Sequence, residues 1–156
     1  MELIAVDKDT VTIKMNWKEE FDPILAAFTA VNKDYGIADH LLHELTKEEI
    51  ARLRLQLANI KLGFCSSGTN RTIHQQSSGI QMVVADQKTV TVKMLQIKEF
   101  LAVFGVFGAL AVRYDLTGQE TDPAISNLTA GSVFTIEESL GGILDSLNRK
   151  YNDKIL

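Results

Sequence analysis

The stretch DKDTVTIKMNWKEEFDPILAAFTAVNKDY (Asp7–Tyr35) recurs 79 residues later as DQKTVTVKMLQIKEFLAVFGVFGALAVRY (Asp86–Tyr114). Eleven of the 29 aligned positions are identical, whereas chance at ordinary residue frequencies gives about two. Two unrelated strand–helix units share a hydrophobic pattern but not residue identity. The match therefore indicates that the chain arose by tandem duplication of a smaller unit.

A second match follows, because Leu45–Asn59 aligns with Phe134–Asn148 once ten extra residues are allowed in the later half. We therefore divide the chain into a first repeat at 1–62, a linker or exposed loop at 63–79 and a second repeat at 80–156. The loop is rich in Ser, Gly, Thr and Asn, which is typical of an irregular connection. Together the repeats have the length of one compact domain.

Each repeat begins with a predicted β-hairpin, in which two short apolar stretches flank a three-residue polar turn at 7–9 or 86–88. In the second strand of each hairpin, at 10–15 and 89–94, apolar and polar residues alternate strictly. This alternation predicts a sheet with one buried face and one exposed face.

Two helices are predicted after each hairpin. The second of them is expected at about 47–62 and at about 136–151, preceded by Thr46 and Thr135, each with glutamate three residues later, the spacing of a capping box. The order ββαα, twice, predicts an α+β fold. We expect a four-stranded antiparallel sheet, helices packed on one face of it, and an approximate twofold axis between the repeats.

The first helix of each repeat, over 21–31 and 97–114, differs in polar content between the copies. The earlier helix carries polar residues on its outer side, whereas the later one is apolar nearly all round, which is typical of a helix buried on more than one side. Glycine inside a helix costs about 1 kcal/mol relative to alanine, so glycines in the later helix require a compensating contact. We therefore expect either that the two corresponding helices cross at these glycines or that the later helix meets a second copy or another protein; a bound apolar ligand is the less favoured alternative. The candidate interface residues are Phe104, Gly105, Phe107, Gly108 and, from the first repeat, Trp17, for which a core position is the other interpretation.

Composition narrows the class of protein. The chain has 156 residues and a formal charge of −4, which disfavours a protein that binds nucleic acid by neutralising phosphates. The longest uncharged apolar run, Phe100–Val112, is shorter than the roughly twenty residues that a membrane-spanning helix needs, so we expect no membrane partner. No secretory leader is recognised and Cys65 is the single cysteine, so we expect a cytoplasmic protein.

One short motif points to chemistry. In CSSGTNRT (65–72), Cys65 is followed after five residues by Arg71 and then by Thr72. This spacing resembles the phosphate loop of protein tyrosine phosphatases and arsenate reductases, which implies a thiolate nucleophile at Cys65 and an oxyanion held by Arg71. In those families the loop leaves a strand and enters a helix. Here it follows a predicted helix at the junction of the repeats, where a linker is the favoured interpretation.

His40 and His43 stand three residues apart and are a candidate metal pair. No further His or Cys has a suitable spacing, and the second repeat has no equivalent pair, so solvated side chains on a short amphipathic segment are the favoured interpretation. The glycine-rich nucleotide-binding patterns, the HExxH zinc motif and the GxSxG hydrolase motif are absent from the sequence. We therefore expect no cofactor.

Three functions follow from these patterns, and the sequence favours a protein that is not an enzyme. The leading hypothesis is a non-catalytic cytoplasmic interaction or adaptor protein that forms a homodimer or binds a partner through the apolar helix at 97–114. The second is a small-ligand-binding protein with a pocket at the seam of the repeats, roofed by the segment 115–133. The third is a cysteine-dependent phosphatase that uses the Cys65–Arg71 loop.

Overall fold

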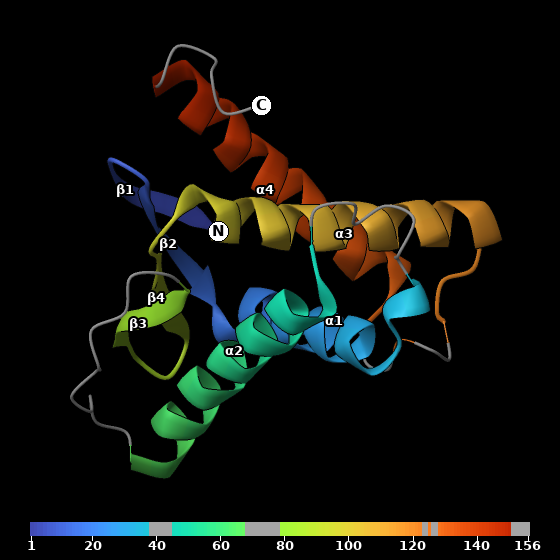
Figure 1. Ribbon diagram of the computed structural model, residues 1–156, viewed down its shortest axis with the longest axis horizontal. Coiled ribbons are helices and arrows are strands. Elements are labelled where there is room, and N and C mark those ends of the chain that lie inside the picture. Colours follow the sequence, from blue (N-terminus) through green and yellow to red (C-terminus); the bar gives the residue numbers. More distant parts are fainter. Residues whose placement is uncertain (38–44, 68–78, 123–124, 126–127, 151–156) are drawn as a thin grey trace.

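The computed structural model describes residues 1–37, 45–67, 79–122, 125 and 128–150. These residues form four strands, four α-helices and two short helical turns (Figure 1). In chain order the elements are β1 (Glu2–Asp7), β2 (Thr10–Asn16), the π-helical turn η1 (Trp17–Phe21), α1 (Asp22–Lys33), the 3-10 turn η2 (Tyr35–Ile37), α2 (Lys47–Ser67), β3 (Ile80–Ala85), β4 (Thr89–Met94), α3 (Ile97–Thr117) and α4 (Ala130–Lys150).

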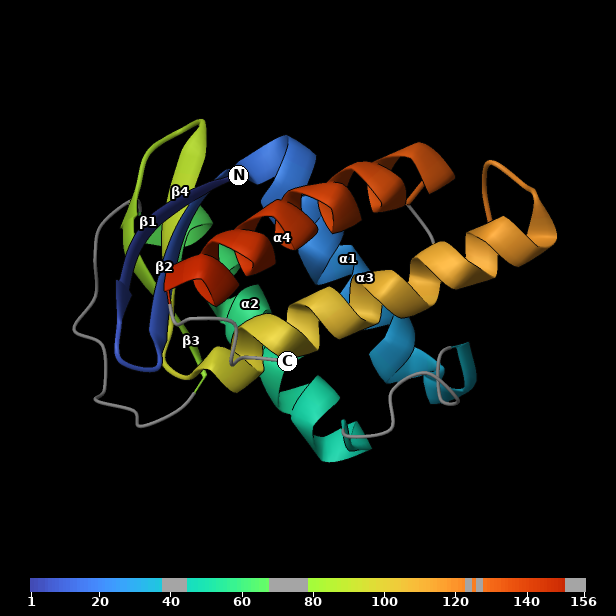
Figure 2. The ribbon, with the colours of Figure 1, turned by 90° about the horizontal axis from the view of Figure 1, so that it is seen from above.

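The strands form one open antiparallel sheet in the order β1-β2-β4-β3. Both predicted hairpins are confirmed, and the second hairpin strand of each half lies in the centre of the sheet. Along β2, the side chains of Val11, Ile13 and Met15 are buried in alternation with more exposed neighbours. The helices lie on one side of the sheet (Figure 2), and these apolar residues belong to the core that the sheet and helices share. The fold is therefore α+β.

In the central pair of strands, β2 and β4, Ile13 lies opposite Val92. These two residues are 79 positions apart in the sequence. Pairing continues symmetrically on both sides of this pair. In order, Val11, Thr12, Ile13, Lys14 and Met15 lie opposite Met94, Lys93, Val92, Thr91 and Val90.

Both outer strands carry the same irregularity. The register shifts between Leu3 and Ala5 in β1 and between Met82 and Val84 in β3, so each strand has one extra residue at positions that are again 79 apart. Bulges of this kind bend an edge strand and disrupt its open ladder of hydrogen-bonding groups.

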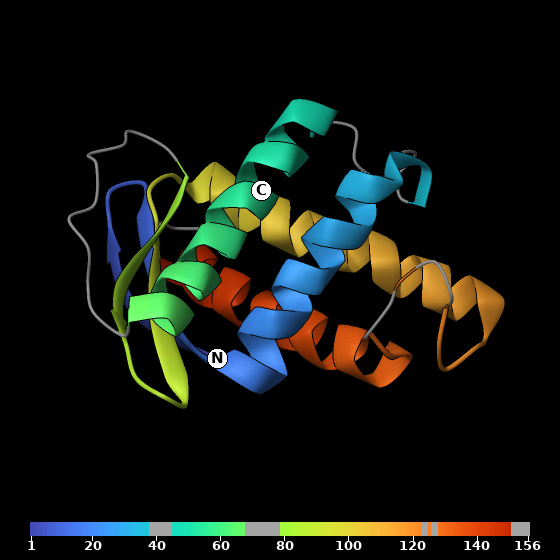
Figure 3. The same ribbon diagram turned by 90° about the horizontal axis from the view of Figure 1, so that it is seen from below.

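The four α-helices form two layers on one side of the sheet, one made of α3 and α4 and the other of α1 and α2. Helices α3 and α4 lie in front of α1 and α2 in Figure 2 and behind them in Figure 3. Within each layer the two helices pack against each other, and α1 also contacts α3 between the layers. The core between these elements is almost entirely apolar and includes Phe21, Phe28, Phe100 and Phe107.

Two glutamates are the buried acidic residues of the described chain, and they occupy matching positions. Glu20 lies 2.6 Å from the amino group of Met1 through Oε2, and Glu99 accepts a hydrogen bond of 2.8 Å from the backbone amide of Gly79. Each carboxylate thus ties the start of a helical segment to the start of the first strand of its own half. A buried carboxylate requires such partners to offset the loss of hydration.

Helix α4 begins earlier than the sequence predicted. The expected start at Ile136 with Thr135 as cap is wrong, because α4 starts at Ala130 and Thr129 caps it by accepting a hydrogen bond of 3.1 Å from the amide of Ser132. The extra turns bury Val133. Burial of this apolar residue together with a usable threonine cap favours the longer helix.

Helix α2 begins where it was predicted and ends later. The side chain of Thr46 accepts a hydrogen bond of 3.1 Å from the amide of Glu49, which confirms the capping threonine. The helix then continues to Ser67, five residues beyond the expected end, so residues 63–67 are helical and do not belong to an irregular linker. The remainder of the expected linker, 68–78, lies outside the described residues.

The starts of α2 and α4 are 83 residues apart, compared with the 89 expected from the sequence match. At this spacing both helices are preceded by the dipeptide Leu-Thr. A tyrosine hydroxyl donates to the leucine carbonyl in each half: Tyr35 to Leu45, and Tyr114 to Leu128 at 2.9 Å. The buried positions of the two helices then coincide: Ile50 with Val133, Leu53 with Ile136, Leu57 with Leu140, and Ile60 with Ile143.

Candidate interaction surface

The residues that suggested catalysis or metal binding do not form a site in the described part of the chain. Cys65 lies in the last turns of α2, not in a loop that leaves a strand. Arg71, His40 and His43 lie outside the described residues. Among those described, no group of three or more His, Cys, Asp or Glu side chains could hold a metal ion.

Two of the five predicted interface residues belong to the core. Trp17 is 4% exposed; its ring packs against those of Phe21 and Phe64, and its indole nitrogen donates a hydrogen bond of 2.8 Å to the carbonyl of Asp86. Phe107 is fully buried. These two aromatic side chains therefore fasten the protein's own elements together and offer no surface to a partner. The other three predicted residues, Phe104, Gly105 and Gly108, are partly exposed.

The partly or fully exposed apolar positions of α3 recur every three or four residues, so they lie along one side of the helix. Exposure increases toward the C-terminal end, from partly buried at Leu101 to 41% at Val112 and 78% at Leu116. We call this surface the α3 stripe. It consists of Ile97, Leu101, Phe104, Gly105, Gly108, Val112 and Leu116.

The first half of the chain contains a matched comparison for the α3 stripe. Residues 79 positions earlier, in and around α1, can be compared with their counterparts in α3. Asp22, Leu25, Ala26 and Lys33 have the same degree of burial as their counterparts, whereas Lys18 and Thr29 are more exposed than Ile97 and Gly108. Their chemistry is different: Lys18 corresponds to Ile97, Asp22 to Leu101 and so on through Lys33, which corresponds to Val112. The whole set is Lys18, Asp22, Leu25, Ala26, Thr29, Lys33 and Ile37. The outward side of α1 is thus largely polar, as expected of a solvated helix, whereas that of α3 is apolar.

Packing among the described residues does not require the glycine at position 108. A β-carbon there would have Oε2 of Glu137 as its nearest neighbour outside the local helix, at 3.7 Å, which is ordinary van der Waals contact. On α4, a β-carbon at Gly141 would have no heavy atom within 4 Å. Each glycine nevertheless costs the helix about 1 kcal/mol relative to alanine. A close approach from outside the described chain would explain this cost.

Helix α4 flanks the α3 stripe with a carboxyl group and an aromatic ring. Burial raises the pKa of Glu137, whose carboxylate lies next to Gly108. Phe134, one helical turn before Glu137, is 41% exposed. Single exposed apolar residues are common on protein surfaces, but a contiguous apolar patch marks an interaction site.

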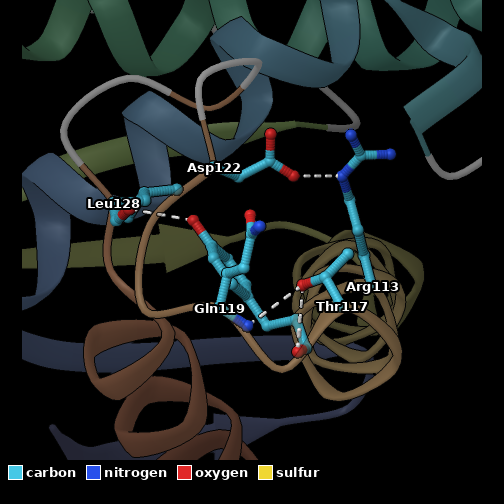
Figure 4. Close-up of polar contacts among 6 residues, drawn as sticks. Arg113, Thr117, Gln119, Asp122 and Leu128 are labelled. Carbon is cyan, nitrogen blue, oxygen red and sulfur yellow. Dashed lines mark hydrogen bonds and ion pairs between the residues drawn. The ribbon is translucent and has the colours of Figure 1, made fainter.

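The end of α3 is held by polar contacts that are structural (Figure 4). The guanidinium of Arg113 lies 2.5 Å from the carboxylate of Asp122, and this hydrogen bond raises the pKa of Arg113. The buried hydroxyl of Tyr114 donates to the carbonyl of Leu128, and burial raises its pKa. These shifts keep the arginine charged and the tyrosine neutral at physiological pH, which suits neither group to proton transfer.

The segment 115–133, which was expected to roof a ligand pocket, is also held by contacts near the ends of α3 and α4. Helix α3 extends to Thr117 and α4 begins at Ala130, so both ends of the segment 115–133 are helical. Between them, Thr121 and Thr129 form a β-bridge, and the carbonyl of Glu120 accepts a hydrogen bond of 2.9 Å from the amide of Ala130. The described part of this segment is therefore fastened to the helices on both sides.

By length and composition, α3 is the one helix among the described residues that could cross a membrane. Half of its most apolar window is buried inside the protein, as in the core helices of soluble proteins. This feature alone does not indicate a location.

The chain matches no model of a known protein family, no curated protein and no solved structure.

Proposed function

We propose that this chain is a non-catalytic, cytoplasmic interaction protein that acts through the α3 stripe, by self-association or by binding another protein. The observation that carries the proposal is the difference between α1 and α3. At positions of equal burial, α1 presents Asp22 and Lys33, whereas α3 presents Leu101 and Val112. Covering apolar surface yields about 25 cal/mol for each Å² removed from water, so covering the exposed part of this stripe favours association.

The proposal includes the origin of this difference. We propose that the protein is a tandem duplication with an approximate twofold axis through the centre of the sheet. Its support is the common spacing of 79 residues in the central register, in the two bulges and in the buried glutamates. A duplication of this kind lets one copy keep a solvated outer helix while the other acquires an interface.

The test is the molar mass in solution of the wild type and of leucine substitutions in the α3 stripe. We expect an associated wild type, by itself or with its partner, and loss of the complex in the Gly105→Leu and Gly108→Leu variants, since leucine prevents close approach. Matched controls are Ala26→Leu and Thr29→Leu, at the corresponding positions of α1, which should leave the complex intact.

Circular dichroism of each variant verifies that the fold is retained. A complex that survives both glycine substitutions, or that is lost equally in the α1 controls, contradicts the proposal. In the first case association uses another surface; in the second the distinction between α1 and α3 has no functional consequence.

A further inference from the structure

We infer that the occupant of the α3 stripe is the α3 helix of a second copy of this chain, which runs antiparallel to the first and crosses it between Gly105 and Gly108. This inference rests on the proposed function, because it names the partner of the same surface. The partner is identified by self-complementarity, which can be read from the positions of the stripe residues.

Six of the seven residues of the α3 stripe are placed symmetrically about the midpoint between Gly105 and Gly108. Phe104 is the exception, because its mirror position is Ala109, which is buried. Moving outward from that midpoint, Leu101 and Val112 are equally distant from it, and so are Ile97 and Leu116. In an antiparallel pair, residues at equal distances on opposite sides of the crossing lie at the same level. Ile97 and Leu101 of one copy therefore lie level with Leu116 and Val112 of the other, and the glycines meet at the crossing, whereas Phe104 has no stripe residue opposite it.

The exposed charges that border the stripe obey the same symmetry. Lys98 and Asp115 are both exposed, are equally distant from the midpoint, and have opposite signs. Neither forms an ion pair within the described part of the chain. Antiparallel crossing brings Lys98 of each copy level with Asp115 of the other, twice in the dimer, whereas parallel pairing sets lysine against lysine. The charges thus favour the antiparallel arrangement.

The glycines supply the close approach that such a crossing needs. A β-carbon at Gly108 would find only ordinary contact among the described residues, with Oε2 of Glu137 nearest at 3.7 Å. At a crossing centred on these glycines, the two α3 backbones approach with no α3 side chain between them, Leu101 and Val112 pack on either side, and the carboxylate of Glu137 borders the contact. A twofold contact of this kind closes on itself and yields a dimer rather than a filament.

Exchange of the two charges tests the arrangement. Lys98→Glu places glutamate opposite Asp115 at both ends of the crossing, and Asp115→Lys places lysine opposite Lys98. At low ionic strength we expect each single variant to weaken the dimer about tenfold, because two attractive pairs become repulsive. The double variant restores opposite charges and should return within about twofold of the wild type. Lys33→Glu, on the outward side of α1, is the control for net charge.

The dissociation constant of each variant is measured by sedimentation equilibrium, with circular dichroism to verify folding. Weakening by both single changes and recovery in the double variant support the inference. A dimer that is lost in Gly108→Leu but is indifferent to the charge exchange overturns the antiparallel crossing and leaves the proposed function standing. A wild type that is monomeric at all concentrations overturns the inference, whether it then binds lipid vesicles or a different protein.

Discussion

Replacement of Gly108 by alanine should change stability and association in opposite directions. Within one copy, the added methyl group meets Oε2 of Glu137 at 3.7 Å without a clash, and alanine favours a helix over glycine by about 1 kcal/mol. The folded monomer should therefore gain about that amount, which raises Tm by roughly 2–4 °C for a chain of this size. In the dimer, two methyl groups are inserted at the crossing, so the helices separate and the dissociation constant rises.

The two effects are measured separately. Urea unfolding at protein concentrations below the dissociation constant reports the monomer alone, because binding adds stability only when the partner is present. Sedimentation equilibrium then reports association. Gly63→Ala is the matched control: Gly63 lies in α2 and a β-carbon there has no heavy atom within 4 Å, so alanine should stabilise the fold and leave association unchanged.

Either of two results refutes this reasoning. If Gly108→Ala destabilises the isolated monomer, then packing within the chain explains the glycine. If the variant is stabilised and associates as tightly as the wild type, then no close approach occurs at position 108, and the exposed glycine has no function in association.

Three further predictions concern the glutamates and the hairpin turn. Glu99→Gln should lower the free energy of unfolding by about 1–3 kcal/mol, because the buried carboxylate accepts a hydrogen bond from a backbone amide. The exposed control Glu138→Gln should have no effect. If urea unfolding shows equal losses of stability in the two variants, the assigned role of Glu99 is contradicted. Hydrogen bonds from the backbone amides of Thr89 and, secondarily, of the neighbouring lysine lower the pKa of Asp86. The stability that the Asp86 carboxylate contributes is therefore present above its unfolded-state pKa and is lost as pH falls through its folded-state pKa. Unfolding of Asp86→Asn should accordingly be less sensitive to acid than that of the wild type, and identical acid sensitivity would show that the turn does not depend on the charge. Burial raises the pKa of Glu137, so ionisation of its carboxyl group destabilises the fold as pH rises through the folded-state pKa. Glu137→Gln should be more stable than the wild type at pH 7 and similar to it at pH 4. A stability difference that is independent of pH would contradict this pH dependence.

The two hairpins could be predicted from the sequence because their signals are local, whereas the strand order stayed open because β2 and β4 pair across distant parts of the chain. Alternation in Thr10–Met15 and Thr89–Met94 sets which side chains face the core, and short polar turns set the pairing within each hairpin. The capping threonine of α2 is local too. The start of α4 was mistaken because the pattern Thr-x-x-Glu at Thr135 resembles a cap, whereas burial of Val133 together with the cap at Thr129 extends the helix earlier.

The candidate site was predicted only in part, because an apolar helix does not reveal which of its sides meets the core. The sequence identified α3 and its glycines, but it placed Trp17 and Phe107 at an interface although both are buried. It overlooked Leu101 and Val112, which are at least partly exposed. The sequence match does contain a signal for these residues, because aligning α3 with α1 pairs apolar residues of α3 with polar residues of α1. The burial of the α1 residues is needed to show that these positions lie at the surface.

The central claim, an antiparallel contact between two α3 stripes, is tested most directly by pulsed electron paramagnetic resonance. Spin labels are attached to Lys98→Cys or Thr117→Cys in a Cys65→Ser background. With 1.5 Å of rise per residue and helix axes about 9 Å apart, a crossing between Gly105 and Gly108 sets the backbones about 27 Å apart at position 98 and about 33 Å apart at position 117. These distances, one for each labelled variant, are the predicted result; about 10 Å at both positions, or no intermolecular distance at all, would contradict the claim.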